Sequence, residues 1–334
     1  MPAPTGLRVE VRAGATFELL IAVSALTSEE GSLDGVSAPL RRAIARVGER
    51  SGELWLHLLG LALELPASLD ARGFVAAVGA TDARELRRHL VGVHVPAWRE
   101  LVGAETLERA AAGDRAAGER LLRHDRYYAG KARDSLSILL PLPAAQTRRR
   151  VLDVLQRFVE EVFAQREAEV VALLEEDAAA QRTRSGEALI AAATGGYVYE
   201  PEPEFSRVVL IPHLAASPWL LLCQHRDARI ICYPAERAAG DAEEALGERA
   251  LRLGRALSDE RRIKILRCLV EGDASLGELA EAVGLAKSTA HHHLAQLRAA
   301  GLVTMGGNAR GYWYVLRREG LADARAVLGE LLVP

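Results

Sequence analysis

The chain has 334 residues, of which 49% are hydrophobic and 26% charged, and its formal net charge is −3. This length suits two or three domains with cores of their own, and the composition excludes a disordered chain. The longest apolar runs, such as Leu19 to Leu26, fall far short of the roughly 20 residues that span a bilayer, so we expect no membrane partner. The three cysteines make no disulfide framework, and with no secretion signal in view they favour a cytoplasmic protein.

Residues 1–195 are expected to form a mostly helical domain for sensing or dimerisation. Leu7 to Val11 alternates apolar and polar residues, which predicts a short strand, and helical patterns follow from Ala15 to about Ile190. The longest helix is predicted from Thr147 to about Gln181. The residues expected on its buried face are Val151, Leu155, Phe158 and Val162.

Residues 196–240 have a different pattern, with three short strands separated by turn residues. The strands are predicted at Val208–Ile211, Trp219–Cys223 and Arg229–Tyr233. We expect a small antiparallel sheet, which the N-terminal strand can join, packed with the helical domain. The fold class is therefore α+β and mostly α.

Residues 241–334 are predicted to form a separate module with a charge of its own. From Gly247 to Pro334 there are 13 Lys and Arg against 10 Asp and Glu, so this part is near +3 and the remainder near −6. A mildly basic module on an acidic body is compatible with DNA binding, because the local potential governs contact with phosphate.

The module begins with helical patterns that have recognisable ends. Ser258 is expected to cap the helix whose buried stripe is Ile263, Leu266 and Val270. Ser275 and Glu278 have the spacing of a capping box, and Gly284 suits the end of the helix that they open. The buried stripe of that helix is predicted to be Leu276, Leu279, Ala280 and Val283.

The next helix, about Lys287 to Ala300, is the candidate recognition helix of a winged helix-turn-helix. Its core face is predicted to be Ala290, Leu294 and Leu297, so that Ser288, His292 and Ala295 point outward. Two strands, Leu302–Met305 and Tyr312–Leu316, form the predicted wing. In this arrangement one helix enters the major groove of DNA. The expected contacts are Lys287, Ser288, Thr289, His291, His292 and Gln296 in the groove, and Arg310 from the wing.

From about Leu246 onward the sequence resembles the ArsR-type winged-helix repressors of bacteria. The matching residues are Arg255-Ala256-Leu257-Ser258-Asp259, Arg262, Ile265-Leu266, Glu278-Leu279-Ala280, Ser288-Thr289, His293-Leu294, Leu297-Arg298, Ala300-Gly301-Leu302-Val303 and Gly311-Tyr312-Trp313-Tyr314-Val315-Leu316. The resemblance covers about a quarter of the chain. It implies a homodimer, formed by the first and last helices of the module, that binds palindromic operators and leaves them on a signal.

Two departures from the family matter. Many members sense metals through paired cysteines, whereas Ser275 and Gly277 stand at the matching positions here, so that site is missing. Ala286 stands where a Ser-like cap usually opens the recognition helix, which removes about 1 kcal/mol of capping.

Other residues suggest chemistry only weakly. Consecutive helical residues point about 100° apart, so the rings of His291, His292 and His293 cannot share one ion. We interpret Cys223, His225, Cys232 and the scattered His57, His89, His94, His124 and His213 as core or surface residues, and the aromatic residues Trp55, Trp98, Tyr127, Tyr128 and Trp219 mainly as core. Gly130-Lys131 lacks the Gly-rich loop and the following Ser or Thr of a phosphate-binding loop. We therefore predict no catalytic site, no metal and no cofactor.

These observations predict a DNA-binding regulator that is a repressor and a homodimer on double-stranded DNA. The N-terminal domain is the expected place for control by a small-molecule effector. One alternative is control by a protein partner, and another is an enzyme domain fused to a DNA-binding module. An aromatic-lined pocket would favour a ligand, whereas an exposed apolar patch would favour a partner.

Overall fold

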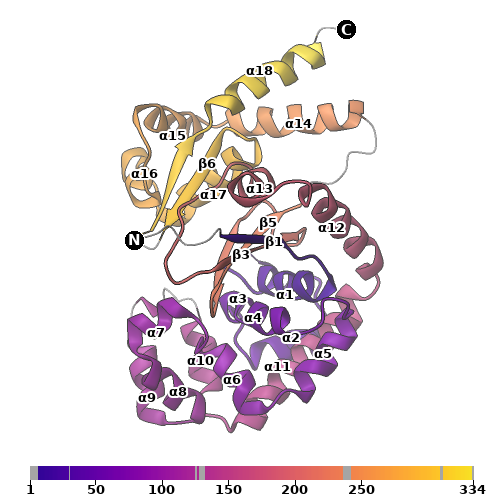
Figure 1. Cartoon of the computed structure of the whole chain (residues 1–334), viewed down its shortest axis with the longest axis vertical. Coiled ribbons are helices and arrows are strands. Elements are labelled where there is room, and N and C mark those ends of the chain that lie inside the picture. The colour runs from indigo at the N-terminus through magenta and orange to yellow at the C-terminus, as the bar shows by residue number, and fades with distance from the viewer. Residues whose placement is uncertain are drawn as a thin grey trace.

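The computed structural model describes residues 7–29, 31–124, 126–127, 132–235, 242–308 and 311–332, with only the backbone at 242–245, 308 and 332. The chain is arranged as a helical part, a four-stranded sheet and a winged helix-turn-helix module, stacked in that order (Figure 1). The expected class, mostly α with small sheets, is confirmed. Within the described ranges, no helix is long and apolar enough to cross a membrane.

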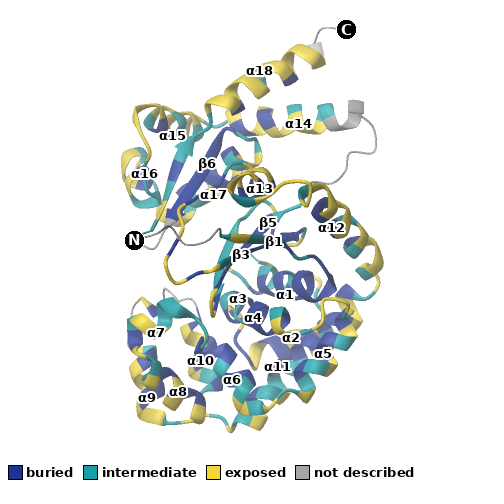
Figure 2. Ribbon diagram, in the orientation of Figure 1, coloured by how far each residue is buried: buried dark blue, intermediate teal, exposed yellow. Residues whose placement is uncertain are grey.

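In sequence order, the helices of the helical part come between the first and the second strand of the four-stranded sheet. Its helices are α1 (Ala15–Leu26), α2 (Ala38–Ala45), α3 (Gly52–Leu56), α4 (Leu58–Glu64), α5 (Ala71–Ala80), α6 (Ala83–Leu90), α7 (Pro96–Val102), α8 (Ala104–Ala112), α9 (Arg115–Leu122), α10 (Arg133–Leu139), α11 (Ala144–Phe158), α12 (Glu167–Gln181) and α13 (Gly186–Thr194). Helix α1 is predominantly apolar and buried on nearly all sides, as expected of a helix surrounded by protein, and Glu18 is its one charged residue. It lies at the centre of the helical part and packs on the sheet (Figure 2).

The long helix predicted from Thr147 to Gln181 is interrupted. A π-helical turn, η2 (Val159–Phe163), follows α11 and separates it from α12. A π turn adds a residue to the repeat and rotates the side chains that follow it. Val162 is therefore 43% exposed, although the regular spacing placed it on the buried face.

The four-stranded sheet is mixed rather than antiparallel. Its strands are β1 (Arg8–Val11), β3 (Arg207–His213), β4 (Leu221–His225) and β5 (Ala228–Pro234), in the order β1-β3-β5-β4. Only β4 and β5 pair antiparallel, whereas β1 with β3 and β3 with β5 are parallel, so the expected antiparallel sheet is wrong for two of the three pairs. The reason is the strand order: β4 lies at the outer edge, and β5 turns back to run beside β3. The predicted participation of the N-terminal strand is confirmed.

The two faces of this sheet belong to two hydrophobic cores. Side chains alternate between the faces along each strand. The residues of β3 and β5 that pack with the helical part are Val209, Ile211, Ala228, Ile230 and Cys232. Those that pack in the core shared with the winged helix-turn-helix are Val208, Leu210, Ile231 and Tyr233. Helices α12 and α13 also contribute to this second core, through residues such as Leu174 and Ile190. The sheet therefore lies between the core of the preceding helices and a core that α12, α13 and the module share.

The winged helix-turn-helix module follows the sheet. Its elements are α14 (Ala242–Leu257), α15 (Glu260–Glu271), α16 (Leu276–Val283), α17 (Lys287–Ala299), β6 (Val303–Asn308), β7 (Gly311–Leu316) and α18 (Arg318–Leu332). The short strand β2 (Val198–Tyr199), which lies between α13 and β3 in the sequence, pairs parallel with β6 and extends the wing. The wing is thus held to the N-terminal part by backbone pairing.

Two details of α15 differ from expectation. Asp259, not Ser258, caps the helix, since its carboxylate accepts the N–H groups of Arg261 and Arg262 at 2.8 and 3.4 Å. The buried positions are Ile265 and Leu269, whereas Ile263 and Val270 are 38% and 58% exposed. Apolar residues on this helix fit two different stripes, and only packing against α16 and α17 decides between them.

Candidate nucleic-acid interface

The helix-turn-helix is positioned by the end signals of α16. The Ser275 hydroxyl accepts the N–H of Glu278 at 3.3 Å, and the Glu278 carboxylate accepts the N–H of Ser275 at 2.7 Å. Gly284 ends α16 with a φ of 68°, a conformation that glycine adopts without strain. The capping box and the glycine stop are both confirmed, and they fix the turn from which α17 starts.

Helix α17 buries the face that its periodicity indicates. Ala290, Leu294 and Leu297 are fully buried, as predicted. The six residues expected in the groove lie on the other sides of the helix, between its first residue and its tenth. Lys287, Ser288, His292 and Gln296 are exposed, and Thr289 and His291 are half-buried. The predicted wing contact Arg310 lies outside the described residues.

One edge of α17 is covered by the loop that leads into β4. The Trp219 ring stacks on His291, with centroids 4.4 Å apart, and meets His292 edge-on at 5.4 Å. Arg298 donates a hydrogen bond to the carbonyl oxygen of Pro218 at 2.8 Å. Ala295, predicted to point outward between these residues, is only 4% exposed. That prediction is wrong because the periodicity of one helix does not show which other parts of the chain pack against its outer face.

The loop that carries Trp219 is anchored in turn to the helical part. The Glu18 carboxylate of α1 accepts the N–H groups of Leu214 at 3.1 Å and of Ala215 at 2.8 Å. Burial raises the pKa of Glu18 to about 7, although these two hydrogen bonds lower it. The Trp219 carbonyl oxygen lies 3.1 Å from Nε2 of His213, so both ends of the loop are fixed.

The three consecutive histidines have different surroundings, as the helical geometry requires. His291 stacks on Trp219, His292 is exposed, and Nδ1 of His293 lies 4.0 Å from the Asp259 carboxylate. Burial, the first of several causes, lowers the pKa of His293. The rings of His291, His292 and His293 therefore face the N-terminal part, solvent and the cap of α15, respectively, rather than a common ion.

The other residues singled out in the sequence are placed as follows. Trp55 is buried and donates to Ser51 at 3.0 Å, and Trp98 packs edge-on against Tyr127 at 5.5 Å. Cys232 is buried in the core of the helical part, while Cys223 and Cys268 are half-buried. Gly130-Lys131 and Tyr128 lie outside the described residues. The histidines are less scattered than the sequence indicated, because His89, His94 and His225 meet in one cluster.

This geometry defines a class of protein: one with a winged helix-turn-helix whose exposed helix can enter a major groove. Residues 259–305 match the family described as bacterial regulatory protein, arsR family. The regulator YgaV of Escherichia coli is 32% identical over 93 residues, which are 27% of this chain and 93% of YgaV. The chain belongs to the arsR family through this module.

Further similarities are limited to the same module. The regulator CmtR of Mycobacterium tuberculosis is 43% identical over 81 residues, which are 24% of this chain. The chain spans 66% of the length of CmtR. The solution structure of a homodimeric winged helix-turn-helix domain from Mycobacterium bovis, a possible ArsR-family regulator, is 29% identical. The likeness covers 28% of this chain and 87% of that one, with a TM-score of 0.24.

Proposed function

We propose that this chain is a transcriptional regulator that binds a palindromic operator as a homodimer and represses by occupying it. The observation that carries the proposal is the exposed polar surface at the start of α17, in a module of the arsR family. The proposed groove contacts are Lys287, Ser288, Thr289, His291, His292 and Gln296, and Arg310 is the proposed wing contact. Residues at the N-terminal half of a recognition helix are those that reach base edges.

The exposed apolar residues of α14 and α18 support the dimer. These helices lie side by side and project away from the rest of the chain (Figure 1). Their exposed leucines include Leu251 at 61%, Leu321 at 48% and Leu328 at 44%. Apolar side chains gathered on two adjacent helices mark an interaction surface, and we assign a second copy of this chain to it.

A substitution at this surface tests the dimer. Leu328→Glu should convert the dimer to a monomer in light scattering, whereas Val270→Glu, at a still more exposed apolar residue on α15, should leave it dimeric. If wild type and Leu328→Glu were both monomeric, the surface would belong to another protein, and control by a protein partner would take the place of the dimer.

The N-terminal part supports a regulatory role because it touches the helix that reads DNA. Trp219 occupies the side of His291 that would otherwise face a groove. DNA and Trp219 therefore compete for the same edge of α17. A ligand that favours one of the two arrangements shifts the DNA affinity by its own difference in affinity for them.

Selection from a random-sequence duplex pool tests the DNA binding itself. The full chain should enrich an inverted repeat whose half-sites lie about one helical turn, or roughly 34 Å, apart. On the selected duplex Lys287→Ala should lower the salt dependence of binding by about one unit per protomer. Lys264→Ala, an exposed lysine paired with Glu260 on α15, is the matched control. Failure to enrich any sequence would contradict the proposal.

Two further variants separate base contact from release of α17. Replacing His291 and His292 by alanine should weaken binding to the selected duplex, since both contacts with the groove are lost. Trp219→Ala should strengthen it, because the covered edge becomes free. If both variants changed the affinity in the same direction, the assignment of these histidines to the groove would be wrong.

A further inference from the structure

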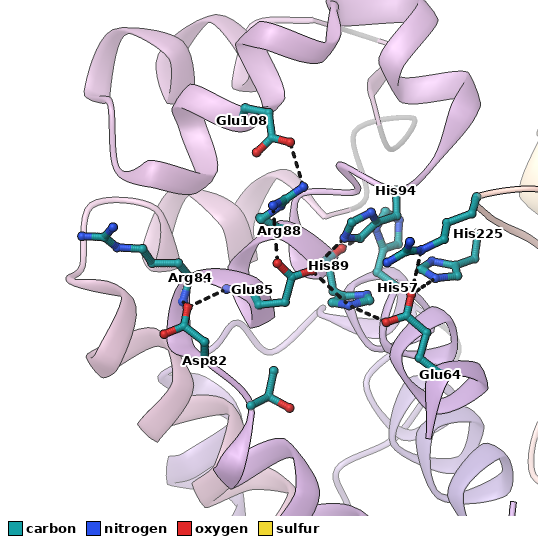
Figure 3. Close-up of polar contacts among 12 residues, drawn as sticks. His57, Glu64, Asp82, Arg84, Glu85, Arg88, His89, His94, Glu108 and His225 are labelled. Carbon is teal, nitrogen blue, oxygen red and sulfur yellow. Dashed lines mark hydrogen bonds and ion pairs between the residues drawn. The ribbon is translucent and has the colours of Figure 1, made fainter. Parts of the chain in front are cut away.

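A cluster of histidines and glutamates lies at the edge of the helical part, where α4, α6 and the end of β4 meet (Figure 3). Glu85, His89 and His94 each offer a ligand atom within 4.8 Å of the others. Nε2 of His94 lies 2.9 Å from the Glu85 carboxylate, and Nε2 of His89 lies 3.8 Å from it. The His89 ring stacks on that of His225 with centroids 5.5 Å apart.

The backbone brings the three residues together from one short segment. Glu85 and His89 are four residues apart on α6 and therefore share a face. Gly92, with a φ of 71°, turns the chain back after α6, so that His94 returns to the same face. A side chain at Gly92 would strain this turn and lie 2.9 Å from the His57 ring, so the glycine is needed for the return.

His89 is the unusual member of the cluster. Its side chain is fully buried, and neither ring nitrogen has a hydrogen-bond partner among the described residues. A buried polar atom without a partner loses its hydration without compensation, so a protein rarely retains one without a use. Two carboxylates approach Nε2 of this ring without bonding to it, Glu85 at 3.8 Å and Glu64 at 3.9 Å.

We propose that Glu85, His89 and His94 bind a divalent transition-metal ion, and that this ion is the effector of the regulator. Two imidazoles and a carboxylate are a ligand set that suits zinc and ions of similar preference. Metal–ligand distances of about 2.0–2.2 Å draw the three donor atoms inward, and the contact between Glu85 and His94 opens to admit the ion. The site is separate from the module that binds DNA, and no cysteine takes part in it.

A second carboxylate supports the site. Glu64, at the end of α4, is bonded through Oε1 to His225 and to Arg226, each at 2.8 Å. Its other oxygen faces His89 at 3.9 Å, where it can orient that ring or complete the coordination. The side chains of Glu64 and Glu85 are 34% and 36% exposed, so an ion reaches the buried histidine through the carboxylates.

The position of His225 connects this cluster with the recognition helix. His225 is the last residue of β4, and the loop that carries Trp219 enters the first residue of the same strand. The N–H of Arg226 also donates to the carbonyl oxygen of His94 at 2.7 Å, which ties the proposed ligand to the end of β4. A shift of His94 on metal binding is therefore passed along one strand to the ring that covers His291. This step rests on the proposed DNA-binding function, whereas the metal site does not.

Metal binding by the full chain is measured first, without DNA. The chelator-treated protein is titrated with Co²⁺, followed through its visible d–d absorption, and the ion is then displaced with Zn²⁺. We expect one ion per chain. Glu85→Gln and His94→Gln should each lower the affinity for Co²⁺ at least about tenfold, since loss of even an indirect ligand contact has an effect of this size.

The controls separate this site from binding elsewhere. His124→Gln removes another half-buried imidazole of the helical part and should bind Co²⁺ like wild type. Glu85→Gln changes a partly exposed side chain and keeps its shape, so it remains informative if His94→Gln does not fold. Wild-type affinity in Glu85→Gln would overturn the site. In the Zn²⁺-loaded chain, X-ray absorption should show histidine nitrogens, and their absence would also overturn it.

The effector role is measured on the selected duplex. Zn²⁺ should change the dissociation constant at least about fivefold in wild type, within the range of ordinary allosteric coupling. The change should vanish in Glu85→Gln and shrink in Trp219→Ala. Unchanged affinity with a loaded site would overturn the effector role and leave the site standing. Metal binding by a chain that selects no DNA would contradict the proposed function alone.

Discussion

The two faces of the four-stranded sheet differ in what they stabilise. One face packs on α1 and the other helices of a core drawn only from the N-terminal part. The other face packs in a core that also contains Leu253, Ile265 and Leu294 of the winged helix-turn-helix. The module therefore packs against the N-terminal part of the chain. The sheet and the helix that carries the proposed DNA contacts thus share one hydrophobic core.

Removing the buried ion pair between Glu202 and Arg229 should destabilise the second face of the sheet more than any other change proposed below. Nε of Arg229 donates to the Glu202 carboxylate at 2.9 Å, and its guanidinium lies 4.7 Å from the Phe205 ring centre. Glu202→Ala leaves a buried charge without a partner, which costs about 3–5 kcal/mol. The urea midpoint of unfolding measures the loss, and hydrogen exchange shows where it falls.

The expected exchange pattern is faster exchange in β2, β5, β6 and β7, with α1 to α4 less affected. Glu204→Gln, an exposed neighbour of the same loop, is the control and should match wild type. If protection from hydrogen exchange fell uniformly over the whole chain, the two cores would unfold as one unit. The two faces of the sheet would then not differ in stability.

Glu18 tests the first face through pH. Its pKa, raised by burial to about 7, exceeds the ordinary value of 4.5. The folded chain therefore holds this proton more tightly than the unfolded chain, and its contribution is fully present below about pH 4.5 and lost as the pH rises to about 7. The loss amounts to about 3 kcal/mol. Urea unfolding over a pH series measures it.

Glu18→Gln keeps an oxygen that accepts the N–H groups of Leu214 and Ala215 but carries no charge. The variant should be more stable than wild type above pH 7, and the difference should disappear below pH 4.5. Glu169→Gln, at an exposed position of α12, should leave the pH dependence as it is. A wild-type pH profile in Glu18→Gln would show that this carboxyl has the same pKa in the folded and unfolded chains.

The features of this fold differ in how far they could be predicted from the sequence. The capping box at Ser275 and Glu278 and the stop at Gly284 could be predicted because their partners lie within a few residues. The boundary predicted at residue 240 stays a prediction, since the core continues across it. The sheet directions could not be predicted, because they depend on which strand takes the edge.

The histidine cluster illustrates the same limit for a site. The spacing of Glu85, His89 and His94 is visible in the sequence, but it becomes a signal only when the turn at Gly92 is known. Glu64 and His225 are 161 residues apart and meet only through packing of α4 against the sheet. The contact of Trp219 with α17 is equally remote from any local pattern. The proposed regulation depends on such long-range contacts, whereas the proposed DNA contacts lie on one short helix and could be predicted from the sequence.

Gly60 tests the packing that brings His225 to the cluster. A Cβ atom at this position of α4 would lie 2.6 Å from Cγ of His225. Gly60→Ala should cost about 1–3 kcal/mol by overpacking and should also weaken Co²⁺ binding, since His225 and Glu64 move together. Gly79→Ala in α5, where the nearest atom is 3.8 Å away, should be neutral or stabilising. Equal stability of the two variants would show that α4 adjusts freely beneath His225.

A substitution at the start of α17 should have the smallest effect on stability, and this effect should be limited to the module. Ala286 has the extended conformation of a cap residue, with φ −64° and ψ 147°, but no side chain that can accept a hydrogen bond. Ala286→Ser should therefore stabilise the chain by about 0.5–1 kcal/mol, and Ser275→Ala, at the filled cap of α16, should destabilise it by a similar amount. Thermal unfolding measures both. Because both caps lie in the module, exchange in α1 to α4 should not change. A slower exchange there in Ala286→Ser would mean that the stability of the helical part depends on the order of α17, and that the coupling across the sheet runs in both directions.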